Sequence, residues 1–297
     1  MKYQSKSAAA AVFLSVTAAF CAQNALAAPS EGCAISESVN ANNHLILLSY
    51  PYTTPVKRVE TYTESDDTGS AFYSVFNYDR CGQILDMHYQ LVKNEQRFIL
   101  DSEYGLTKMD DGWLNSYSVT MYNIFAKQRV LAFAREGTTR YRTDANGLIV
   151  GSIENYTAGS KEKIESGETR GSYLLDSTKR IANVTLLGSD GGDNRFFYNG
   201  SGMPFSFTSP NSHIIYLYDK QGRQDSSLEI SVSSFYFGSK KSNCTEWNSH
   251  NDCTRAVSDE IELFPNYAVQ RKSVFRSTFS YWDEESNQDA RLVNKEK

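Results

Sequence analysis

Hydrophobicity alternates with a period of two residues along most of the chain, and this alternation constrains the fold more than any other feature. It is clear in residues 72–78, 196–200 and 230–234. A period of two places successive side chains on opposite faces of an extended strand, whereas an amphipathic helix needs a period near 3.6. The sequence therefore predicts a protein built mainly of β-strands.

Short segments rich in Asp, Asn and Gly separate the strand-like runs. Such turns at short intervals are typical of antiparallel hairpins that follow one another along the chain. We therefore predict an all-β fold, an antiparallel meander of hairpins in an extended or curled sheet, with little helix after residue 28. The predicted strands include 45–49, 57–63, 83–92, 113–122, 148–156, 180–187 and 273–282, and the turns include 66–69, 110–112, 144–147 and 189–192.

Two stretches leave alternatives open. Residues 122–136 could form a helix with Ile124 and Leu131 on one face, or two strands that turn at Lys127 and Gln128. The polar stretch 158–172 could join two halves of the chain or form a hairpin within one domain. We assign one β-rich domain to residues 28–282 and a polar tail to residues 283–297.

Residues 1–27 predict a signal peptide. Lys2 and Lys6 precede an alanine-rich apolar run, which ends in Ala-Leu-Ala at residues 25–27, the pattern of a signal-peptidase site. The run is shorter than the roughly 20 residues of a membrane-spanning helix, so the mature chain is predicted to lack an integral membrane segment. Neither Cys21 nor Cys33 lies in a lipoprotein context, so we expect export to the periplasm or beyond without a lipid anchor.

Four cysteines remain after the signal peptide, and an oxidising compartment would pair them. Four cysteines allow three pairings, which sequence alone does not separate. The short spacing favours Cys244 with Cys253, leaving Cys33 with Cys81. A metal site at Cys244, His250 and Cys253 is the alternative, but their spacing matches no common zinc motif. We predict two disulfides and no metal.

The charge balance argues against binding to nucleic acid. The chain has 30 basic and 35 acidic residues, and loss of the two leader lysines changes the net charge from −5 to −7. Binding to phosphate backbones normally needs clustered Lys and Arg, which the sequence lacks. An acidic protein is instead attracted to basic partners.

No catalytic motif or cofactor-binding loop is recognisable. The four histidines are scattered, and the nucleophile-elbow, zinc-protease and phosphate-loop patterns are absent from the sequence. Acidic pairs such as Asp110-Asp111 could serve a glycosidase only if the fold brought two carboxylates together. We therefore predict no catalytic residues and no cofactor. We favour a non-enzymatic protein over an enzyme.

A short turn motif recurs three times. In each unit a Tyr precedes Asp or Asn, and Gly follows three residues after the Asp or Asn. The acidic or amide side chain is expected to cap the turn, Gly to adopt positive φ, and Tyr to lay its ring on the neighbouring strand with its hydroxyl in water. These structural-turn residues are Tyr78, Asp79 and Gly82; Tyr198, Asn199 and Gly202; and Tyr218, Asp219 and Gly222.

These units resemble the YD repeat of Rhs-type proteins, whose pattern is Tyr-Asp-x-x-Gly-Arg at a period near 20. Residues 218–223 match the core of the pattern, and residues 78–84 match it with Gln83 in the Arg position. The resemblance implies hairpins rolled into a long sheet or shell, and an association with toxin delivery between bacteria.

Three functional hypotheses remain. The first is a non-catalytic envelope protein that binds a protein partner, in one version an immunity or accessory factor of a toxin system. The alternatives are a module that binds carbohydrate or another envelope polymer, and a β-rich glycan hydrolase. The candidate partner contact is Trp247, held in the loop between Cys244 and Cys253; packing of Trp247 under its own loop explains the residue equally well.

Overall fold

The computed structural model describes residues 33, 35–48, 56–64, 69–160, 163–188, 191–233 and 236–283. These residues form helix α1 (Glu37–Leu48) and sixteen strands. The strands are β1 (Val56–Thr63), β2 (Ser70–Tyr78), β3 (Ile84–Asn94), β4 (Phe98–Met109), β5 (Gly112–Phe125), β6 (Gln128–Thr143), β7 (Ile149–Gly159), β8 (Ile164–Leu175), β9 (Ile181–Gly188), β10 (Gly192–Tyr198), β11 (Pro204–Thr208), β12 (Ser212–Tyr218), β13 (Gln224–Ser233), β14 (Tyr236–Trp247), β15 (Cys253–Phe264) and β16 (Tyr267–Tyr281).

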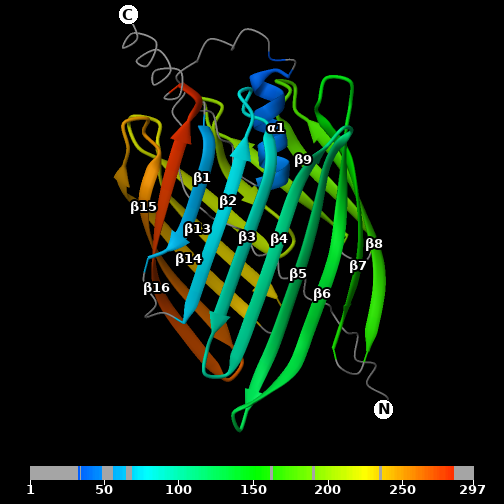
Figure 1. The fold of residues 1–297 in the computed structure, drawn as a ribbon, viewed down its shortest axis with the longest axis vertical. Coiled ribbons are helices and arrows are strands. Elements are labelled where there is room, and N and C mark those ends of the chain that lie inside the picture. The colour runs from blue at the N-terminus through cyan, green and yellow to red at the C-terminus, as the bar shows by residue number, and fades with distance from the viewer. Residues whose placement is uncertain are drawn as a thin grey trace, which may run out of the picture.

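The strands form a closed antiparallel barrel. Each strand pairs with the next in sequence, and β16 returns to pair with β1 (Figure 1). At this closing seam the hydroxyls of Thr61 and Ser277 lie 2.9 Å apart and are both buried. The predicted all-β antiparallel meander is confirmed. The structure is more specific than an extended or curled sheet, because the last strand closes on the first.

Alternation of side chains gives the barrel an inner and an outer face. In β2, Ser74, Phe76 and Tyr78 are buried, while Tyr73 is exposed. Buried apolar side chains cluster at both ends of the barrel: Trp113 and its neighbours pack with α1 at one end, and Phe98 and its neighbours lie at the other. The period-two pattern of the sequence therefore corresponds to an interior and an exterior face.

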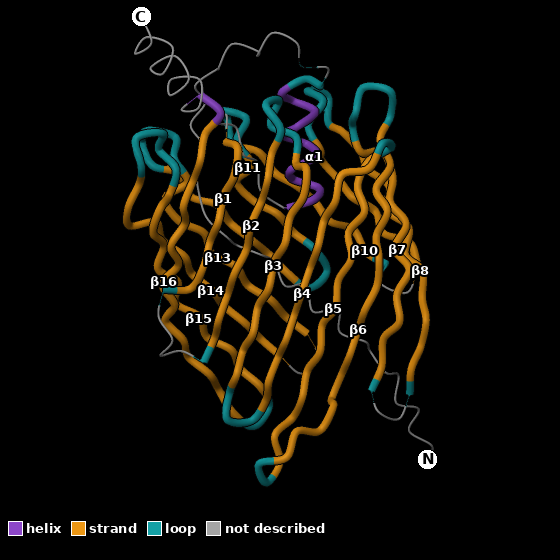
Figure 2. Tube along the Cα trace, in the orientation of Figure 1, coloured by secondary structure: helices purple, strands orange, loops and turns teal. Residues whose placement is uncertain are grey.

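The predicted strand over residues 45–49 is wrong, because Leu45 to Leu48 form the last turn of α1. This run is apolar throughout, so it lacks the periodicity that separates a strand from a buried helix end. Tertiary contacts select the helix: Figures 1 and 2 show α1 at the end of the barrel where the chain enters β3, β5 and β9. The Leu45 side chain is buried there against residues of β9 and β10.

Residues 122–136 form two strands and not a helix. β5 ends at Phe125 and β6 begins at Gln128. Ala126 and Lys127 between them have φ of 48° and 67°, the two positive values of the two-residue turn that suits a twisted hairpin. The stretch 158–172 runs from the end of β7 into β8.

Some predictions fall on residues outside the described part of the chain. These are the signal peptide at 1–27, residues 284–297 of the polar tail, and parts of the turns predicted at 66–69 and 189–192. Within the described residues, no helix is both long enough and apolar enough to cross a membrane.

Six hairpin turns at the α1 end of the barrel share one geometry, which the turn between β4 and β5 does not adopt. In each, an Asp or Asn oxygen accepts the backbone N–H groups two and four residues ahead, as Asp219 does from Gln221 and Arg223 at 2.9 Å. The residue three ahead has positive φ, which is 80° at Gly222. The acceptors of this kind are Asp79, Asp144, Asp176, Asn199, Asp219 and Asn248.

The recurring motif therefore caps turns as predicted, and the structure adds turns that the motif does not find. The motif misses Asp176 and Asn248 because neither follows a Tyr and because the residue with positive φ is Lys179 or Asn251, at 64° and 66°, instead of Gly. A search for Asp or Asn followed three residues later by Gly, Asn or Lys would have found both.

Gly222→Val is expected to lower the free energy of unfolding by about 1 kcal/mol or more, because a β-branched side chain is strained at positive φ. No atom lies within 4 Å of a Cβ at this position, so the cost is conformational and not steric. The matched control is Gly200→Val, in the preceding turn of the same kind, where φ is not positive and the surroundings are equally open. Equal costs in urea denaturation would contradict this account.

Candidate functional site

The hydrogen-bonded, charged and aromatic side chains that could form a site lie in the interior of the barrel and at its α1 end. Two of the motif tyrosines bind the hairpin before their own. Tyr198 donates to the carbonyl of Ile181 at 2.7 Å, and Tyr218 donates to that of Pro204 at 2.5 Å. Each accepting carbonyl lies five residues after the Asp or Asn that caps the preceding turn. The expectation of hydroxyls left in water is wrong for these two tyrosines, because each hydroxyl bonds to the neighbouring strand.

Trp247 occupies the equivalent position in the unit capped by Asn248. The Arg223 guanidinium lies 4.3 Å from its ring centroid and bonds the Asp219 carboxylate at 2.7 Å. Arg180 repeats the arrangement between Asp176 and the ring of Tyr198. Trp247 is half-buried beside the disulfide of its own loop, so its ring packs within the protein. Its role as a partner contact remains a prediction.

Both disulfides expected from the cysteine spacing are present. Cys244 and Cys253 join β14 to β15, with 5.9 Å between their Cα atoms. Cys33 and Cys81, with 5.6 Å between Cα atoms, tie the residues before α1 to the turn between β2 and β3. Both bonds lie at the α1 end of the barrel.

Helix α1 contacts three hairpin turns in nearly the same way. The Asn43 side chain donates to the Gly147 carbonyl at 2.8 Å and accepts from the N–H of Ile149 at 2.9 Å. Asn42 makes the same two bonds at the turn between β8 and β9, and the His44 ring lies 2.8 Å from the Gly82 carbonyl. In each case the carbonyl belongs to the residue with positive φ. The helix therefore closes this end of the barrel through hydrogen bonds specific to these turns.

A row of tyrosines and glycines crosses the inner face from β3 to β8. The rings of Tyr104 and Tyr117 stack, with centroids 5.7 Å apart. A Cβ on Gly137 or Gly167 would clash with the tyrosine rings beside it, so glycine is required for this packing. In register order the row is Tyr89, Tyr104, Tyr117, Gly137, Tyr156 and Gly167.

A second row of paired inner residues lies two residues nearer α1 on each strand. It is apolar on β2 to β4 and polar from β5 to β8. On β2, β3 and β4 the paired inner residues are Phe76, Met87 and Leu106. From β5 to β8 the row continues as Asn115, Thr139, Glu154 and Thr169, which we call the inner polar row. From β5 to β8 the barrel wall therefore presents a polar surface to the interior.

Glu154 is bound by two neighbours. The Arg135 guanidinium lies 2.9 Å from its carboxylate, and the Tyr117 hydroxyl donates a short hydrogen bond to it. Arg135 also donates to the Tyr117 hydroxyl at 2.8 Å and lies 3.8 Å from the ring centroid of Tyr156. The group is neutral overall and fixed in orientation.

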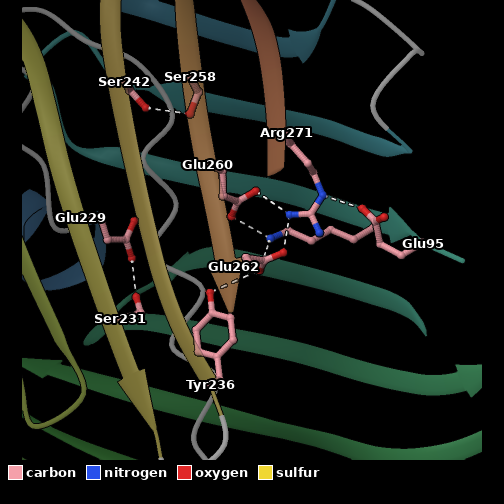
Figure 3. Close-up of polar contacts among 10 residues, drawn as sticks. Glu95, Glu229, Ser231, Tyr236, Ser242, Ser258, Glu260, Glu262 and Arg271 are labelled. Carbon is pink, nitrogen blue, oxygen red and sulfur yellow. Dashed lines mark hydrogen bonds and ion pairs between the residues drawn. The ribbon is translucent and has the colours of Figure 1, made fainter. Parts of the chain in front are cut away.

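An ionic cluster crosses the interior nearer the other end, where β3 faces β15 and β16 (Figure 3). The Lys93 ammonium lies 2.8 Å from Glu260 and 2.9 Å from Glu262. Arg271 pairs with Glu95 at 2.6 Å and with Glu260 at 2.8 Å, and it also contacts Glu262. These bonds connect the end of β3 to β15 and β16, past the intervening strands β1 and β2.

Glu229 on β13 adds a further carboxylate to this region, with Ser231 as a hydrogen-bond partner at 3.3 Å. Burial raises the pKa of Glu229 to about 7, although Lys240 favours the ionised form. Burial would also raise the pKa of Glu260, but Lys93, Lys240 and Arg271 outweigh it and hold that pKa below its usual range. The pKa values of the two buried carboxyl groups are thus shifted in opposite directions.

The described residues offer little machinery for catalysis. Among them, no group of three or more His, Cys, Asp or Glu side chains could hold a metal ion. The Ser206 hydroxyl lies 2.9 Å from the His213 ring, but no hydrogen bond or ion pair with a carboxylate orients His213 within the described part of the chain. A serine nucleophile normally needs its base oriented by a third group.

Comparisons with known proteins identify no family. No protein-family model and no curated protein matches the chain. Among solved structures, the chain is similar to a porin-like protein from Bacteroides uniformis ATCC 8492, with 10% sequence identity and a TM-score of 0.40, over 76% of this chain and 98% of that one. Membership of the YD-repeat family therefore stays a prediction.

Asn43→Ala is expected to lower the free energy of unfolding by about 1–3 kcal/mol, because it leaves a buried carbonyl and a buried N–H without partners. Ser38→Ala on the same helix is the control, since the Ser38 hydroxyl contacts only Ser36 at an exposed position. Chemical denaturation should separate the two variants; similar losses would contradict a specific contact between α1 and the turn.

Glu229→Gln should make stability less dependent on pH. The pKa of Glu229 is about 7 in the folded protein and 4.5 for a free side chain, so ionisation of the unfolded chain lowers stability as pH rises from about 4.5 to about 7. The loss is on the order of 3 kcal/mol, and Gln cannot ionise.

The advantage of Glu229→Gln over the parent protein should therefore grow between pH 5 and pH 8. Exposed Glu168→Gln serves as the control and should follow the parent at every pH. Parallel unfolding curves for the parent and Glu229→Gln would contradict the assignment.

Proposed function

We propose that this protein is a non-catalytic, exported envelope protein that binds a protein partner on the outer face of its barrel. The observation that carries the proposal is an exposed apolar strip on β13, β14 and β15. Val232 pairs with Phe237, and Phe237 pairs with Leu263, so the three side chains are neighbours on one face. They are 50%, 38% and 44% exposed, and Ile261 beside Leu263 is 44% exposed.

Charged residues border one side of this strip. Lys241, Asp259 and Lys272 pair across β14, β15 and β16 and are all exposed. An apolar centre with a charged rim is the usual composition of a protein interface, because the centre is desolvated on binding while the rim stays in water. A contiguous exposed apolar patch is a recognised mark of such a site.

Elsewhere the outer face carries charged side chains at the middle of strands. Glu103, Arg140, Glu168 and Arg170 are all exposed there. Such positions favour contact with water, which supports a protein that works in an aqueous compartment.

The two disulfides support export, since such bonds persist mainly outside the reducing cytosol. The predicted signal peptide points to the same compartment. The predicted net charge of −7 favours a basic partner, because long-range attraction speeds encounter. An immunity or accessory role in a toxin system is a hypothesis that depends on the YD-repeat resemblance alone.

The strip is tested by Phe237→Asp and Leu263→Asp, which place a charge at the centre of the proposed interface. Both variants should lose, at least tenfold in affinity, an envelope protein that the native mature chain retains in periplasmic pull-downs and chemical cross-linking. Leu187→Asp is the matched control, because Leu187 is an exposed apolar residue on β9, outside the strip.

Circular dichroism would first establish that all three variants fold. Retention of the partner by both strip variants would refute the proposed surface. Recovery of polysaccharide alone, or turnover of cell-wall or glycan substrates, would refute the proposed function. Trp247→Ala tests separately whether the loop between Cys244 and Cys253 contacts the protein partner.

A further inference from the structure

The inner polar row adjoins a space that solvent reaches. Arg135 and Glu154 point into the barrel, since they contact Tyr117 and Tyr156 of the inner tyrosine row. Even so, their side chains are 10% and 19% exposed. Asn115 and Thr139, on the same face as Glu154, are also only half-buried. The interior is therefore not filled by protein atoms beside this row.

Thr169 supplies a second, independent observation. It is paired in register with Glu154 and is 3% exposed. Its hydroxyl has no hydrogen-bond partner among the residues that the structure describes. A buried hydroxyl without a partner costs about 1–3 kcal/mol, and a polar group from outside the chain would remove that cost.

The lower part of β8 gives access to this region. Along the inner face of β8, exposure increases from Thr169 through Gly167 to Glu165, whose side chain is 57% exposed near the strand end. The Tyr156 ring packs over Gly167 and borders this part of the interior. The end closed by α1 is the opposite one, because α1 contacts the turn that follows β8.

We propose that the inner polar row, with Arg135 and Tyr117, is a binding site for an uncharged polyhydroxylated ligand, a sugar ring of a neutral glycan. Arg135 and Glu154 neutralise each other, so a charged ligand would have to compete with an existing ion pair. Vicinal hydroxyls can accept from a guanidinium and donate to a carboxylate at the same time, without breaking the pair.

The other groups of the row match such a ligand. Asn115, Thr139 and Thr169 offer a mixture of donors and acceptors, as hydroxyl groups require. The rings of Tyr117 and Tyr156 border the polar groups and exclude water from part of the site, which strengthens each hydrogen bond. A few convergent polar groups beside aromatic walls are the usual composition of a small-ligand site.

Thr169→Val is the sharpest test, because valine keeps the shape and removes only the hydroxyl. The apo protein should lose no stability, since the hydroxyl makes no bond within the described residues, while the affinity for a neutral glycan should fall about tenfold. A structural role for Thr169 predicts the reverse: lower stability and unchanged binding. Thr138→Val, an exposed outer-face position on β6, is the control.

The ligand class is tested on the full mature protein with an array of neutral oligosaccharides, followed by calorimetry with those that bind. Glucuronate, glucosamine and indole serve as anionic, cationic and apolar comparators. A neutral glycan should bind most tightly, and Glu154→Gln should weaken it because the carboxylate acceptor is lost. Tighter binding of any comparator, no binding to any glycan, or unchanged affinity in Thr169→Val would overturn the proposal.

This site is separate from the apolar strip on the outer face. Leu263→Asp should lose the protein partner and keep glycan binding, while Thr169→Val should show the opposite. The two proposals can therefore fail independently.

Discussion

The pairing of β1 with β16 is the interaction on which the rest of the structure depends. It removes the two free edges that a meander would otherwise expose, and it converts the two faces of the sheet into an interior and an exterior. Only after closure can Lys93 on β3 reach Glu260 and Glu262 on β15. The ionic cluster, the inner tyrosine row and the inner polar row all depend on that enclosure.

The barrel interior differs from one side to the other. Near β3, β15 and β16, Lys93 and Arg271 are buried in ion pairs that connect these strands, and Glu229 is buried beside them. Near β5 to β8, Asn115, Thr139 and Glu154 are only partly buried, and Thr169 beside them is buried without a hydrogen-bond partner among the described residues. Ion pairs that are fully satisfied restrict the geometry of the first side, whereas the second keeps hydrogen-bonding capacity that a ligand could use.

The hairpin units explain why short motifs recur in a barrel without an obvious sequence repeat. Each unit caps its own turn through Asp or Asn, and the aromatic residue of a later hairpin bonds back to the turn before it, as Tyr198 and Tyr218 do. Trp113 makes the same kind of bond to the Ile84 carbonyl at 2.8 Å. The constraint falls on one or two positions in each hairpin, so the rest of each strand is free to vary.

The sequence alone determined the local structure. Alternating hydrophobicity predicted strands, Asp and Gly at turns predicted the hairpins, and cysteine spacing favoured both disulfides, because each signal depends on residues close together in the chain or on the pairing of the few cysteines present. It did not reveal α1, whose Asn42 and Asn43 bond to turns about a hundred residues away. Tertiary structure alone decided barrel closure and the neighbours of Glu154 and Thr169. Closure depends on pairing between β1 and β16, which are far apart in the chain, and the neighbours of Glu154 and Thr169 depend on the register of consecutive strands. No local pattern encodes either, and together they decide which polar side chains share one interior.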